Sequence, residues 1–105
     1  MEDLRNKDKS IKIVWNEIVS FFGSGYFRIV DYWEADNFAI GIIRDNKLIY
    51  ISTWELNKEP DSEILCYTEF EILNGKEQIP YKLEKRIDEI SISKLIIEIK
   101  NFIIS

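Results

Sequence analysis

Asp45-Asn-Lys-Leu-Ile-Tyr-Ile-Ser-Thr-Trp-Glu55 is the stretch of this sequence that decides the fold class. Residues 47–55 are rich in β-branched and aromatic side chains, which is typical of a strand. Asp45 and Asn46 both accept positive φ, so they suit a tight hairpin turn to the β-branched run before them. The stretch therefore predicts an antiparallel sheet.

Working outward, three similar runs flank this strand, and polar turns separate them. Leu56–Ser62 contains Pro60 and Asp61 and is predicted to be a loop, because proline cannot donate to a central ladder. Consecutive strands joined by short turns pair with their neighbours. We expect a four-stranded antiparallel meander with strands Tyr26–Glu34, Asn37–Arg44, Lys47–Glu55 and Glu63–Leu73.

Helical patterns lie at the two ends of the chain. Apolar residues recur at helical spacing up to Phe22, starting from Asp8 or Ser10, and Gly23-Ser24-Gly25 suits a helix end. Ser93 is expected to cap a second helix from Lys94 to Ile103. The pattern over Tyr81–Glu89 leaves a further short helix open. The predicted class is α+β: an N-terminal helix, a four-stranded antiparallel sheet and a C-terminal helix.

The size and composition predict one folded domain over residues 1–105, because 105 residues close one hydrophobic core. No apolar run approaches the roughly 20 residues that cross a bilayer, and no export signal is expected. The single cysteine, Cys66, excludes an internal disulfide and suits a reducing compartment. We expect a cytoplasmic protein.

The net charge of −5 argues against binding to nucleic acid or to anionic membranes, since both need clustered basic residues. The acidic residues gather in the middle of the chain: residues 31–71 contain ten of them and only three basic residues. A basic protein surface is the partner that this charge favours.

The sequence contains no histidine, the usual general base and metal ligand near neutral pH. Serine and cysteine triads with histidine are therefore impossible, and zinc is excluded by ligand count. Cys66 lies in an apolar strand row and is expected to be an inert core thiol. Glu69 and Glu71 could form a catalytic carboxylate pair, but any solvated strand face shows the same pair. We expect no enzyme activity, no metal and no cofactor.

Strand parity divides each strand into two rows of side chains. Glu69 and Glu71 cannot face a dry core without a partner, so their row should face away from the helices. With both helices on one side, the open side is expected to carry Tyr50, Trp54, Tyr67, Glu69 and Glu71. This side could be a solvated face, a binding face for another protein, or the interface of a homodimer.

The stretches Leu48-Ile-Tyr-Ile-Ser-Thr-Trp-Glu55, Cys66-Tyr-Thr-Glu-Phe-Glu71 and the terminal Ser93–Ile103 helix resemble, in build and texture, the small acidic immunity proteins of bacterial polymorphic toxin and contact-dependent growth inhibition systems. The resemblance implies a non-catalytic antitoxin that binds one cognate toxin domain, often a basic nuclease. It transfers no residue by position. The interpretation from the residues adds that Tyr50, Trp54 and Tyr67 anchor the partner, and that the acidic groups meet its basic surface. These acidic groups are Glu55, Asp61, Glu63, Glu69 and Glu71. The alternative is a homodimeric structural or regulatory adaptor that pairs through the same open face.

Overall fold

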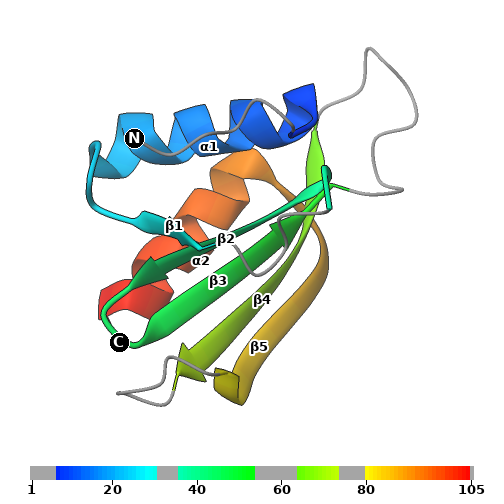
Figure 1. Cartoon of the computed structure of the whole chain (residues 1–105). Coiled ribbons are helices and arrows are strands. Elements are labelled where there is room, and N and C mark those ends of the chain that lie inside the picture. Colours follow the sequence, from blue (N-terminus) through cyan, green and yellow to red (C-terminus); the bar gives the residue numbers. More distant parts are fainter. Residues whose placement is uncertain (1–6, 31–35, 54–63, 74–79, 105) are drawn as a thin grey trace.

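The computed structural model describes residues 7–30, 36–53, 64–73 and 80–104, and it has the α+β architecture that the sequence predicts (Figure 1). Two helices accompany one antiparallel sheet, whose strands are ordered β1-β2-β3-β4-β5 as in the sequence. The helices are α1 (Lys9–Phe22) and α2 (Ile92–Ile104). The strands are β1 (Arg28–Val30), β2 (Ala39–Arg44), β3 (Lys47–Ser52), β4 (Leu65–Leu73) and β5 (Pro80–Ser91).

Local interactions mark both ends of helix α1. The Asp8 carboxylate accepts a hydrogen bond from the Ser10 N–H, which satisfies one of the free donors of the first turn. At the other end, Gly23 adopts φ 101° and its N–H donates to the Val19 carbonyl, a conformation that disfavours side chains. The predicted end at Phe22 is confirmed, and the helix begins at Lys9, between the two starting points that the sequence left open.

The β2–β3 hairpin is the centre of the meander. Arg44 pairs with Lys47, so the turn consists of Asp45 and Asn46 as the sequence predicts. Asp45 takes the positive φ, at 55°, and is the only residue besides glycine to do so in the described part of the chain. The two-residue turn fixes the register of the hairpin, in which Ile42 lies opposite Ile49.

The sheet has a fifth strand, which corrects the expectation of four strands and decides against the short helix that the sequence left open over 81–89. Residues 80–91 form β5 and pair antiparallel with β4. Ile87 and Ile90 are three residues apart, as on a helix, yet they lie opposite Thr68 and Cys66, which are two apart. The extra residue is taken up by an irregularity in the ladder, so both isoleucines reach the same face. Because of this shift of register, Ile87 and Ile90 have the spacing of a helix in the sequence although they belong to a strand.

Helix α2 follows β5 without a loop and starts earlier than predicted. It begins at Ile92, so Ser93 lies inside the helix, and the Lys94 N–H instead approaches the Ser91 hydroxyl at 3.5 Å. The prediction of Ser93 as the cap is wrong by two residues, because the serine-rich sequence Ser91-Ile-Ser93 offers two capping side chains.

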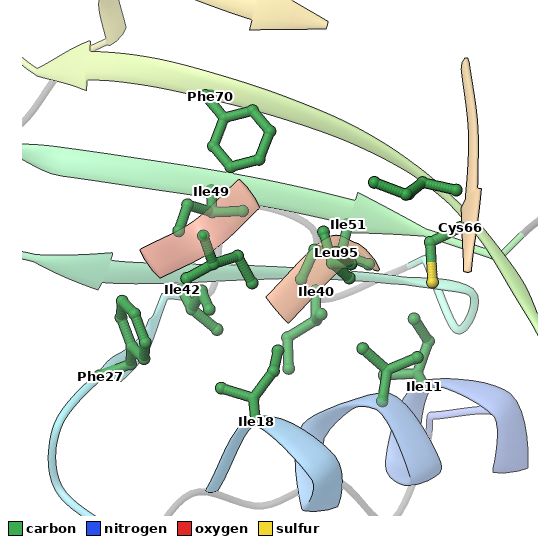
Figure 2. Close-up of a cluster of buried hydrophobic side chains, with 13 residues drawn as sticks. Ile11, Ile18, Phe27, Ile40, Ile42, Ile49, Ile51, Cys66, Phe70 and Leu95 are labelled. Atoms are coloured by element: carbon green, nitrogen blue, oxygen red, sulfur yellow. The ribbon is translucent and has the colours of Figure 1, made fainter. Parts of the chain in front are cut away.

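Both helices pack on the same side of the sheet and enclose the main core (Figures 1 and 2). Helix α1 contributes Ile11, Val14 and Ile18, while α2 contributes Leu95 and Ile99. The strands present one row each to them, in agreement with the predicted parity of β3 and β4. The strand residues of the core include Ile40, Ile42, Ile49, Ile51, Cys66, Phe70 and Ile90.

The opposite side of the sheet is only partly open, which corrects the expectation of a wholly free face. Four buried apolar side chains form a second cluster there, near the β2–β3 turn. Leu48 is fully buried although it shares its row with Tyr50. The cluster comprises Val30, Ile43, Leu48 and Leu73. The part of this side left for function therefore lies farther along β3 and β4.

Candidate protein-binding face

Four of the predicted binding residues lie together on the side of the sheet away from the helices: Tyr50 on β3 and Tyr67, Glu69 and Glu71 on β4. Their strand neighbours Ile49, Ile51, Cys66 and Phe70 point into the helix-covered core, which fixes the orientation of the row. All four side chains are half-buried. We call this set of four residues the Tyr–Glu face.

The β3–β4 register sets the geometry of the Tyr–Glu face. Tyr50 lies opposite Glu69, Ser52 opposite Tyr67 and Leu48 opposite Glu71. The rings of Tyr50 and Tyr67 meet edge to face with centroids 6.1 Å apart. The Tyr67 hydroxyl donates a hydrogen bond to the Glu69 carboxylate two residues along the same strand. This contact fixes one carboxylate beside one ring.

The surroundings of Glu71 are less favourable for a negative charge than those of Glu69. Its partners in the register are Leu48 on β3 and Leu83 on β5, and both are apolar. Burial, and then the charge of Glu69, raise the pKa of Glu71. No hydrogen bond or ion pair to Glu71 is formed within the described part of the chain. Among the residues that the structure describes, no cation pairs with its negative charge.

The two tyrosines stay protonated at neutral pH and act as hydrogen-bond donors. Burial raises the pKa of Tyr67 to about 12, and the bond to Glu69 contributes in the same direction. Burial also raises the pKa of Tyr50, partly opposed by a hydrogen bond from Ser52. Each residue thus combines an apolar ring with a neutral polar tip, the combination favoured at protein interfaces.

Strand β5 supplies a rim that the sequence reasoning missed. Arg86 lies opposite Glu69 in the register, and its Nε is 3.3 Å from the Asp88 carboxylate. Leu83, beside Glu71, is 50% exposed. These residues escaped prediction because the spacing of residues 81–89 resembled a helix. Only the pairing of β5 with β4 brings them to the face.

The other four predicted binding residues, Trp54, Glu55, Asp61 and Glu63, lie outside the described residues, in the segment that joins β3 to β4. Their part in binding stays a prediction.

The charge of the described residues differs from that of the whole chain. They include ten acidic and eleven basic side chains, so the net charge of −5 arises from the rest of the sequence. Within the acidic middle, Asp36 and Asp45 serve the fold: Asp36 accepts a hydrogen bond from the Phe38 N–H, and Asp45 forms the hairpin turn. Glu69 and Glu71 are the two acidic residues of this region that the described sheet presents for binding.

The remaining candidate for a reactive side chain, Cys66, has a structural role. Cys66 is fully buried in the core, and burial raises the pKa of its thiol to about 12, so it stays protonated and unreactive. In the described ranges, no three acidic or cysteine side chains gather in a way that would hold a metal ion. Neither described helix has the length and apolar character needed to span a membrane.

No protein-family model, curated protein sequence or solved structure matches this chain.

Proposed function

We propose that this chain is a non-catalytic immunity protein that neutralises a cognate toxin domain by binding it through the Tyr–Glu face. The observation that carries the proposal is the placement of two tyrosines and two glutamates in one row on β3 and β4, on the side of the sheet away from the helices. The resemblance of the sequence to such proteins agrees with this placement.

The physical chemistry of the face fits a basic protein partner. Tyrosine rings bury large areas at a small loss of conformational entropy, which makes them common anchors of interfaces. A half-buried carboxylate such as Glu71 is stabilised when a cation lies against it, because the cation offsets the free-energy cost of burying a negative charge. The partner that we propose is a toxin domain with a basic surface, such as a nuclease, and the site of action is the cytoplasm.

A binding experiment with charge reversals tests this proposal. The proposal expects a toxin domain to be encoded beside this gene. The double substitution Glu69→Lys with Glu71→Lys should abolish protection against that domain and co-purification with it. The control Glu17→Lys reverses a charge at an exposed position of α1, on the helix side of the sheet, and should bind normally. If the first variant folds, as judged by circular dichroism, and still protects, the Tyr–Glu face is not the binding site.

The alternative, a homodimeric adaptor, is favoured by one observation, the 50% exposure of Leu83 next to Glu71. Against it, two copies that met through this face would bring Glu69 and Glu71 toward the same residues of the second copy, and like charges repel. Light scattering at increasing concentration decides between them. A stable dimer that dissociates on Tyr67→Ala would support the adaptor, whereas a monomer would exclude it.

A further inference from the structure

We draw no further inference here: the strongest candidate, the exposed apolar patch of Ile97 and Ile104 on the outer face of α2, carries none because nothing in the structure shows what covers it.

Discussion

Lys47 of β3 caps the C-terminal end of α2. Its Nζ donates to the Phe102 carbonyl, 55 residues later in the sequence, at 2.8 Å and to the Ile103 carbonyl at 3.2 Å. The last turn of α2 contains no basic residue of its own. A cation from the sheet thus satisfies carbonyl groups that have no partner within the helix.

Replacing this lysine should loosen the end of the chain. We expect Lys47→Met to lower the free energy of unfolding by about 1–2 kcal/mol, because the hydrogen bonds and the charge at the helix end are lost together. Urea denaturation measures the change. Lys100→Met, at an exposed position of α2, is the control and should change stability by less than about 0.5 kcal/mol. Equal midpoints for the two variants would contradict the role of Lys47.

The buried hydroxyls of Ser10 and Thr53 should be energetically coupled. Their oxygens are 2.7 Å apart, and the Ser10 hydroxyl also donates to Asp8, so the start of α1 is joined to the end of β3. In a double-mutant cycle with Ser10→Ala and Thr53→Val, we expect a coupling of about 1 kcal/mol in the free energy of unfolding. Strictly additive effects would show that the two hydroxyls act separately.

The raised pKa of Glu71 predicts an unusual pH dependence for one substitution. A carboxyl group whose pKa is higher in the folded state destabilises the fold when ionised. This penalty is fully present at neutral pH and disappears as the pH falls below the ordinary value of 4.5. Glu71→Gln should therefore be more stable than the parent at pH 7 and equal to it near pH 3. Urea midpoints at both pH values test this, and an advantage that persists at low pH would refute it.

The thiol of Cys66 should resist modification until the protein unfolds. Complete burial and a pKa of about 12 leave almost no accessible thiolate at pH 8. With a disulfide reagent such as DTNB, we expect no reaction in the native state and one equivalent in urea. Rapid reaction of the native protein would mean that β4 opens locally. The variant Cys66→Ser, which has no thiol, gives the background.

The sequence predicted correctly those features of the fold that depend on neighbouring residues only. The helix end at Gly23, the Asp45-Asn46 turn and the parity of β3 and β4 each depend on neighbouring residues, and all are confirmed. Parity also placed Tyr50, Tyr67, Glu69 and Glu71 on one face.

Prediction failed where the arrangement depends on distant partners. The spacing of Ile87 and Ile90 has meaning only against Thr68 and Cys66, so no local pattern could identify β5. The burial of Leu48 on the side expected to be open likewise depends on residues of three other strands. Arg86 and Leu83 at the rim of the binding face were missed for the first of these reasons.

The irregular ladder of β5 also bears on how this protein behaves at high concentration. β5 is the last strand of the sheet, and residues 82–86 are all exposed, four of them charged. A long strand at the end of a sheet ordinarily invites another chain to pair with it and start a fibril. Here the register shifts break the repeat that a newcomer would have to match, and the charges on Lys82, Glu84, Lys85 and Arg86 keep it hydrated. The feature that concealed β5 in the sequence therefore also protects the folded protein from edge-to-edge aggregation.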